Sequence, residues 1–155
     1  MGLGCNGVTI RRATLEDAKK LARKLRAADV REIYRGSGRP PLVSLMTGVR
    51  ETESYTAIDE SGNPVMMFGI SREDGLGIVW ALGTDYVTQH PKTLQRLTVK
   101  VLENFSKGVD RLGGLIDPDN TTHVRWLQAN GFTVEEPSVP VGPRSILFCP
   151  FYRYV

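Results

Sequence analysis

The sequence predicts a mixed α/β domain, of the α+β type, and three observations predict it. The 155 residues are 41% apolar and 24% charged, which suits one soluble domain with a buried core. Stretches with strand and helix periodicity follow one another in the order β-α-α-β-β-β-α-β-α-β-β. The G-x-G-x-x-G fingerprint of a dinucleotide-binding sheet is missing. We therefore expect a single domain over residues 1–155, with residues 1–7 as a flexible N-terminus.

The first predicted strand is Val8–Arg12, in which apolar and polar side chains alternate. Thr14 is then expected to cap the N-terminus of a helix. Asp17 stands three residues later, in the capping-box position, where its charge also suits the positive end of the helix. Apolar residues at helical spacing carry this first helix to about Ala28.

A second helix is predicted after a glycine- and proline-rich break at residues 36–41. Pro41 suits the first turn of this helix, because the N–H that proline lacks has no partner within the helix there. From Leu42 to Val49 the apolar residues recur at i, i+3, i+4 and i+7. The spacing therefore indicates one buried helical face.

The middle of the chain reads as three strands and a helix. Tyr55–Asp59 and Pro64–Ile70 form a hairpin across a glycine-containing turn. Gly77–Val87, rich in apolar and aromatic residues, is expected to be a central strand. Pro91 opens the next helix, whose apolar stripe ends at Phe105.

The last third adds a short strand, a helix and two final strands. Leu115–Ile116 reads as a buried strand. Asn120–Asn130 is the predicted helix, ended by Gly131 as the residue after its C-cap. Phe132–Val134 and Ser145–Tyr154 are the remaining strands, separated by a proline-rich connection.

Charge gives little indication of a nucleic-acid partner. Twenty Lys and Arg stand against seventeen Asp and Glu, a net charge of +3. The basic residues gather in the first helix, where we interpret them as a solvated face. The alternative is a docking surface for an acidic partner or RNA.

Cysteine and hydropathy patterns indicate a cytoplasmic protein without a metal site. Cys5 and Cys149 lie near opposite ends with no CxxC spacing, so we predict two thiols and no zinc centre. No apolar run approaches the ~18 residues of a membrane span, and no signal peptide is evident.

Three segments resemble the GNAT (Gcn5-related N-acetyltransferase) superfamily. Residues 8–18 are similar to the family's opening "IRxATxxD". Residues 78–105 occupy the place of its acetyl-CoA motif, and residues 120–132 are similar to its "NxxAxxLYxxxGF" element. The resemblance implies a largely antiparallel, twisted sheet of about six to seven strands flanked by about four helices.

The resemblance also implies a pyrophosphate-binding loop at residues 89–94. The family pattern Q/R-x-x-G-x-G/A uses small residues so that phosphate can approach backbone N–H groups. Gln89 matches this pattern, whereas Lys92 and Leu94 stand where small residues are expected, and Pro91 removes one N–H. This departure puts acetyl-CoA binding in question.

The residues that the resemblance assigns to acetyl-CoA lie on the central strand, the loop and the last helix. Asn120 has an alternative role as the N-cap of its helix. The predicted cofactor-binding residues are Tyr86, Val87, Gln89, Lys92, Thr93 and Asn120.

The predicted catalytic residues are Asp85, His123 and Tyr86. Asp85 and His123 are candidates for handling the proton of the attacking amine, and Tyr86 is a candidate acid, because Leu127 replaces the family's usual Tyr. The alternatives are structural: Tyr86 packs on the core, and His123 fixes the helix start by bonding a nearby aspartate.

Two functional hypotheses follow, and a third is weaker. The first is an acetyl-CoA-dependent N-acetyltransferase acting on an amine of a protein or small molecule. The second is a non-catalytic interaction protein, since the chain also resembles small GNAT-like proteins of short-tailed bacteriophages; a bacterial host protein would then be its partner. The third is a nucleic-acid-binding module.

Overall fold

The computed structural model describes residues 4–155. Of the segment 1–7, residues 1–3 lie outside that range, whereas Gly4–Cys5 forms the first strand. The strands are β1 Gly4–Cys5, β2 Val8–Arg12, β3 Glu53–Ile58, β4 Pro64–Glu73, β5 Leu76–Gly83, β6 Arg111–Ile116, β7 Thr133–Val134, β8 Val139–Val141 and β9 Ile146–Tyr154. The helices are α1 Leu15–Ala22, α2 Ala27–Ser37, α3 Pro41–Glu51, α4 Tyr86–Gln89, α5 Pro91–Phe105 and α6 Thr121–Ala129.

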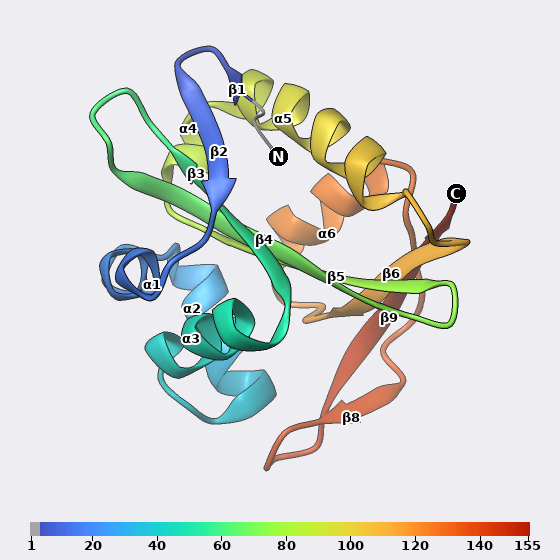
Figure 1. Cartoon of the computed structure of the whole chain (residues 1–155). Helices are drawn as coiled ribbons and strands as arrows, with labels where there is room; N and C mark the ends of the chain where they lie inside the picture. Colours follow the sequence, from blue (N-terminus) through green and yellow to red (C-terminus); the bar gives the residue numbers. More distant parts are fainter. Residues whose placement is uncertain (1–3) are drawn as a thin grey trace.

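One nine-stranded sheet forms the middle layer, in the order β1-β2-β3-β4-β5-β6-β9-β7, with β8 paired to β9 (Figure 1). All pairs are antiparallel except β5 and β6. The expected α+β class with a largely antiparallel sheet is therefore confirmed, and the strands outnumber the expected six to seven. None of the helices in residues 4–155 has the length and hydropathy needed to cross a membrane.

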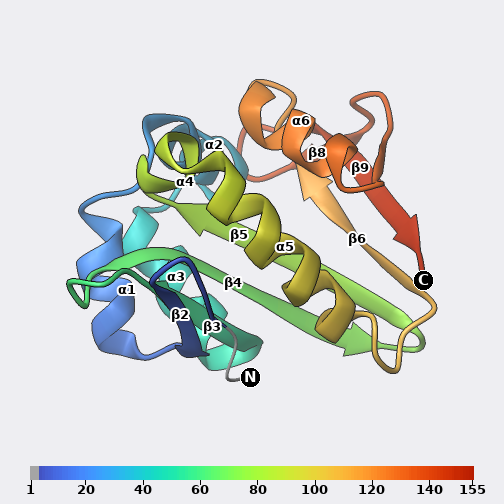
Figure 2. The same ribbon diagram turned by 90° about the horizontal axis from the view of Figure 1, so that it is seen from above.

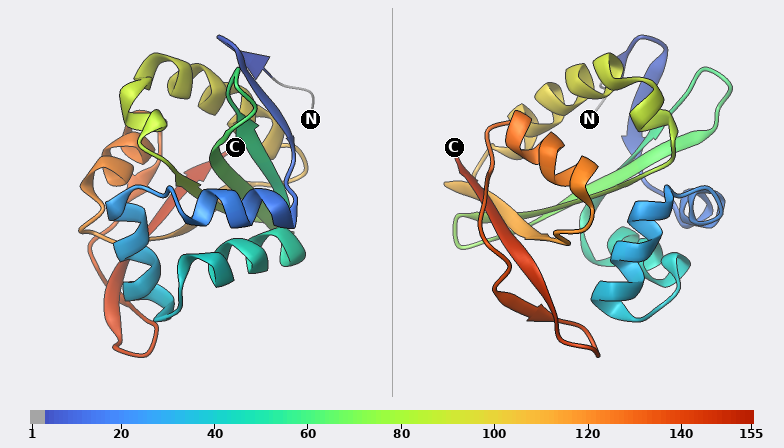
Figure 3. Two further views of the ribbon diagram at one scale, coloured as in Figure 1. Left: turned by 90° about the vertical axis from the view of Figure 1, so that its left-hand side faces the viewer. Right: turned by 180° about the vertical axis from the view of Figure 1, so that it is seen from behind.

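Helices cover both faces of the sheet (Figure 3). The α5 face carries the larger core, in which the rings of Tyr55, Phe68 and Phe105 lie 5.9–6.2 Å apart. On the α3 face, Leu21 and other residues of α1 and α3 pack against Met67 of β4. Burial of these apolar side chains supplies the main driving force for folding.

The predicted start of the first helix is confirmed, but its end is not. Thr14 and Asp17 form the capping box in both directions. The helix then stops at Ala22, and a separate helix, α2, follows a short link. The link leaves helical geometry because it pairs with the end of β5: Leu25 forms a bridge to Thr84.

The central strand is shorter than predicted. β5 ends at Gly83, and Tyr86, expected at the strand end, begins the short helix α4 instead. The Thr84 hydroxyl accepts a hydrogen bond from the Tyr86 N–H at 3.3 Å, which turns the chain at this point. The proline-rich connection also contains the unpredicted strand β8.

The parallel contact between β5 and β6 is brief. Leu76 pairs with Arg111, Gly77 with Leu112 and Ile78 with Gly113. Beyond Ile78 the two strands diverge, and β6 continues against β9 alone (Figure 2). The sheet therefore opens on one side of β5.

Candidate active site

The opening beside β5 is closed at its far end by the link before α2. The Gly83 N–H donates to Asp29 Oδ2 at 2.9 Å, and the Gly83 carbonyl accepts from the Arg26 N–H at 2.9 Å. The Thr84 N–H, by contrast, bonds to Val65 of β4. Because successive backbone groups of a strand alternate in direction, the groups of Ala81 point to the same side as those of Gly83, into the opening.

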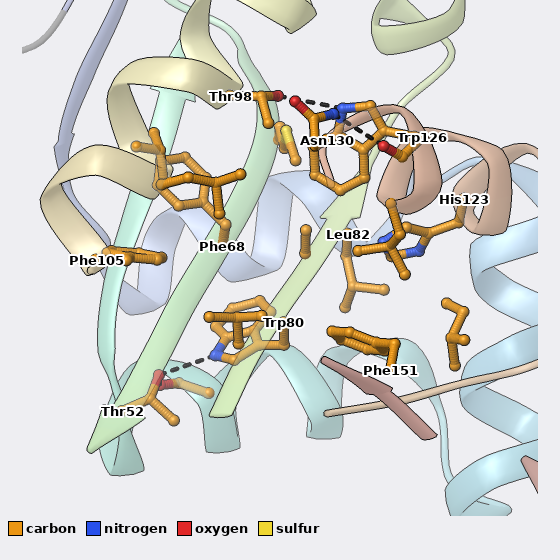
Figure 4. Close-up of a pocket in the computed structure, with 18 of the residues that line it drawn as sticks. Thr52, Phe68, Trp80, Leu82, Thr98, Phe105, His123, Trp126, Asn130 and Phe151 are labelled. Atoms are coloured by element: carbon orange, nitrogen blue, oxygen red, sulfur yellow. Dashed lines mark hydrogen bonds between the residues drawn. The ribbon is translucent and has the colours of Figure 1, made fainter. Parts of the chain in front are cut away.

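A cavity of about 350 Å³ passes through the sheet at this opening. On the α3 face it is lined by Trp80 and Leu82 of β5 and by residues of α3. On the α5 face it is lined by Phe105 and other residues of the larger core. Figure 4 shows these side chains around the cavity, with the Trp80 indole held by Thr52 at 3.0 Å.

A second cavity of about 310 Å³ adjoins the first between the end of β5, the start of α5 and α6. Val87, Pro91 and Leu94 line it. Both cavities have Ala81 and His123 among their lining residues. We call the two together the channel: it runs from the start of α5, past the open edge of β5, to the α3 face.

A buried polar cluster ties α2 to the start of α6. Asn120 is 2% exposed, and its Nδ2 donates to Asp29 Oδ1 and to Glu32 Oε1, each at 2.9 Å. Asp29 Oδ1 also accepts from Arg26 at 2.9 Å. Asn120 Oδ1, however, has no hydrogen-bond partner within residues 4–155. We call Asp29, Glu32 and Asn120 the α2–α6 cluster.

Two members of this cluster line the channel: Glu32 lines the first cavity and Asp29, paired with Arg26, lines the second. Burial raises the pKa of Glu32 to about 8, and the charges of Asp29 and Asp117 act in the same direction. The hydrogen bond from Asn120 opposes this effect without cancelling it. The Glu32 carboxyl is therefore largely protonated at neutral pH and close to its point of titration.

His123, a predicted catalytic residue, lies where the two cavities meet. Its ring is 5.2 Å from that of Trp126. Burial lowers the pKa of His123 to about 4; Asp29 opposes the shift and Arg26 adds to it. The imidazole is therefore neutral at pH 7. The predicted alternative is a hydrogen bond from His123 to a nearby aspartate. His123 instead contacts Trp126, and Asp117 accepts a hydrogen bond from Arg35 at 2.6 Å.

The structure places the other two predicted catalytic residues outside the channel lining described above. Asp85 is exposed, and its carbonyl accepts the Gln89 N–H of α4. Tyr86 stacks on His90 with ring centroids 3.9 Å apart. Burial raises the pKa of Tyr86, and the charges of Asp59 and Glu60 act in the same direction.

Only some of the predicted cofactor-binding residues lie at the channel. Val87 lines the second cavity. Gln89 and Lys92 are exposed near the start of α5, while buried Thr93 accepts a bond from Asn6, on the side of β1. Asn120 makes no side-chain cap of α6, because its amide is committed to the α2–α6 cluster.

Sequence reasoning missed Asp29 and Glu32. Both fall in the helix that was not predicted, α2. A signal was present: Asp29, Glu32 and Ile33 stand at helical spacing, and Ile33 is apolar and buried. Two carboxylates on the apolar face of a helix indicate either a buried ion pair or a functional site.

The fold is that of GNAT acetyltransferases. An acetyltransferase of the GNAT family from Bacillus anthracis aligns over 99% of this chain and 98% of its own, with a TM-score of 0.69 and 11% identity. A putative ribosomal-protein-serine acetyltransferase from Vibrio cholerae aligns over 100% and 98%, with a TM-score of 0.67 and 13% identity. At such low identity the likeness shows the fold alone.

A ribosomal-protein-S5-alanine acetyltransferase from Vibrio fischeri has a similar likeness, with a TM-score of 0.67 and 14% identity over 99% of this chain and 96% of its own. At the level of sequence, no family model and no curated protein matches the chain.

Proposed function

We propose that this protein is a GNAT-type N-acetyltransferase that transfers an acetyl group from acetyl-CoA to an amine. The observation that carries the proposal is the channel through the sheet, with the open edge of β5 on its wall. The Ala81 N–H, directed into the opening, would hold the acyl oxygen as negative charge develops on it. Bound acetyl-CoA would supply the acetyl thioester.

The second cavity fits the flexible arm of CoA. Val87, Leu94 and Trp126 line part of it with apolar side chains, which suits an uncharged chain. The charged side chains in its lining, Arg26 and Asp29, neutralise each other as an ion pair. At its outer end the exposed Lys92 and the free N–H groups of the first turn of α5 suit a phosphate. Leu94 takes up space that a small residue would leave open, so we expect binding to be weaker than with the family's loop.

The test is isothermal titration with acetyl-CoA and with CoA. We expect binding in the micromolar range by the wild type and about tenfold tighter binding by Leu94→Ala, which widens the channel. Val99→Ala is the matched control, because Val99 is 55% exposed on the same helix. No binding by any variant at millimolar acetyl-CoA would contradict the proposal.

A second variant separates chemistry from binding. Ala81→Pro removes an N–H that faces the opening and takes no part in pairing with β4, so the sheet should tolerate it. We expect it to retain acetyl-CoA and to lose about 100-fold in turnover, a typical loss for one donor to a developing oxyanion. Ala81→Val, which keeps the N–H, is the control.

A non-catalytic interaction protein is the second candidate. Two observations favour it: Leu127, buried at the position of the family's Tyr, cannot donate a proton, and Pro91 and Leu94 interrupt the phosphate loop. Because the chain resembles phage proteins, a bacterial host protein is the partner to seek. Under the first proposal, the same host protein would be the acceptor of the acetyl group. Stoichiometric capture of one host protein without acetylated product would favour this candidate.

A further inference from the structure

We propose that Glu32 receives the proton of the attacking amine, and that the acceptor is a cationic primary amine entering the channel from the α3 face. The inference rests on the proposed function and adds to it the class of acceptor and the base. Neither was indicated by the sequence, which pointed to Asp85 and His123.

The α3 end of the channel is acidic and lacks a counter-charge. Glu32 of α2 and Glu51 of α3 both line the first cavity. Within residues 4–155, no Lys, Arg or His nitrogen lies within 4.0 Å of either carboxylate. The nearby guanidinium groups are engaged elsewhere: Arg26 pairs with Asp29, and Arg35 pairs with Asp117. A positive charge brought by a ligand would meet no cationic competitor at these two carboxylates.

The hydrogen-bonding groups around Glu32 are also unbalanced. The Asn120 amide gives both its N–H groups to carboxylates, and its buried Oδ1 remains without a donor. Within the described part of the chain, Asn120 Oδ1 is thus a buried acceptor that lacks a donor, beside a carboxyl that lacks a cation. An ammonium group carries three donors and a positive charge, and so supplies what is missing.

The pKa values favour Glu32 over His123 as the base. A primary ammonium releases its proton near pH 10.4, as lysine does. An ordinary glutamate, with a pKa of about 4.3, would take that proton only against a gap of about six pKa units. Burial of Glu32 raises its pKa to about 8 and reduces the gap to about two units. His123, whose pKa burial lowers to about 4, is the weaker base.

The groups around Glu32 come from each element packed against it. Asp29 lies on α2, Asp117 follows β6, Asn120 precedes α6, and Glu51 lines the same cavity from α3. The first three affect its pKa as described, the two aspartates raising it and the amide lowering it. Entry of an ammonium therefore displaces the proton of Glu32 to solvent and leaves an ion pair.

The proton balance of a turnover is then complete. The ammonium nitrogen gives one proton to the Glu32 carboxylate and forms the new C–N bond as the C–S bond breaks. The second proton of the nitrogen goes to the departing sulfur. Glu32 is then protonated again, as it was before the amine entered, so the one proton that reaches the solvent per amide formed is the proton displaced on entry.

The first test needs no cofactor. 1,4-Diaminobutane, and 1,4-butanediol as its uncharged analogue, are titrated into the full chain at pH 7 in two buffers of different ionisation enthalpy. We expect the diamine to bind the wild type with release of a fraction of a proton per site, and the diol not to bind. Binding of diamine to Glu32→Gln should be at least tenfold weaker and release no proton.

Glu103→Gln, a substitution on the exposed surface of α5, is the matched control and should behave as the wild type. Glu32→Asp is a second variant, in case the glutamine variant fails to fold. The shorter side chain should keep proton release while weakening binding. Equal diamine binding by wild type and Glu32→Gln, or no binding to the wild type up to 10 mM at pH 7 to 9, would overturn the inference.

Acetyl-CoA titration of the same variants separates the two proposals. If acetyl-CoA binds, and if the affinity for the diamine is the same with and without the Glu32 carboxyl, the further inference fails and the proposed function stands. If the diamine binds through Glu32 and no variant binds acetyl-CoA, the cation site stands and the acetyltransferase proposal fails.

Discussion

Two sites with buried carboxylates stand on helices α1 and α2, and they are built differently. Asp17 of α1 accepts from Arg11 at 2.7 and 2.9 Å, from the Thr14 N–H at 3.0 Å and from the Thr56 hydroxyl at 2.9 Å. Burial alone would raise the pKa of Asp17, but these donors hold it below its ordinary value. The carboxylate is ionised and fully satisfied.

The α2–α6 cluster is the opposite case. Asp29 is paired with Arg26, but Glu32 shares the Asn120 amide with it and faces the channel without a cation from residues 4–155. Asn120 Oδ1 has no donor in that part of the chain. The comparison indicates that the first cluster stabilises the fold, whereas the second costs stability and prepares a site. Three substitutions test that distinction.

The largest effect should come from Asp17→Ala. It removes the Asp17 half of the capping box together with the bonds to Thr56 and Arg11, so we expect the free energy of unfolding at pH 7 to fall by about 3 kcal/mol in urea titrations. Because the folded pKa of Asp17 is lowered, its stabilisation is present above about pH 4 and is lost as the pH falls below that value. Glu16→Gln, at the exposed neighbouring position in the same helical turn, should change stability by less than about 0.5 kcal/mol.

A smaller loss is expected for Asn120→Leu. This change leaves Asp29 and Glu32 without their shared donor, at a cost of about 2 kcal/mol in the free energy of unfolding. Gln128→Leu on the exposed face of the same helix is the control and should have little effect. Equal stability of the two variants would mean that the cluster is not a structural link between α2 and α6.

The smallest effect, and the one of opposite sign, is expected for Glu32→Gln. Because the folded pKa of Glu32 is raised to about 8, its contribution is complete below about pH 4 and is lost as the pH rises to 8. The variant should match the wild type at pH 4 and exceed its free energy of unfolding at pH 9 by at least about 1 kcal/mol, the equivalent of one of the pKa units by which burial raises the Glu32 pKa. A loss of stability at pH 9 would place Glu32 with Asp17, as a structural carboxylate.

The same contrast explains what the sequence could predict. The capping box of Thr14 and Asp17 was predictable because its partners lie three residues apart. The GNAT resemblance likewise gave the fold, since its motifs are local runs of residues that begin strands and helices.

The features that the sequence did not predict depend on pairing between residues far apart in the chain. The first predicted helix runs through the link and on to about Ala28, because nothing local shows that Leu25 pairs with Thr84. The end of β5 at Gly83 depends on the same pairing, and so Tyr86 was placed on a strand. Asn120 looked like a helix cap, since the sequence does not show that its amide meets α2.

The hydrogen bonds of Asp29 have a consequence for how the site forms. They join Asp29 to Gly83, which is 54 positions away, and to Asn120, which is 91 positions away. The site therefore spans most of the chain. Contacts between residues so far apart form late in folding, because closing the long loop between them has a high cost in conformational entropy. A nascent or truncated chain would therefore have no partly formed site to occupy, and a ligand of the channel would recognise only the fully assembled protein.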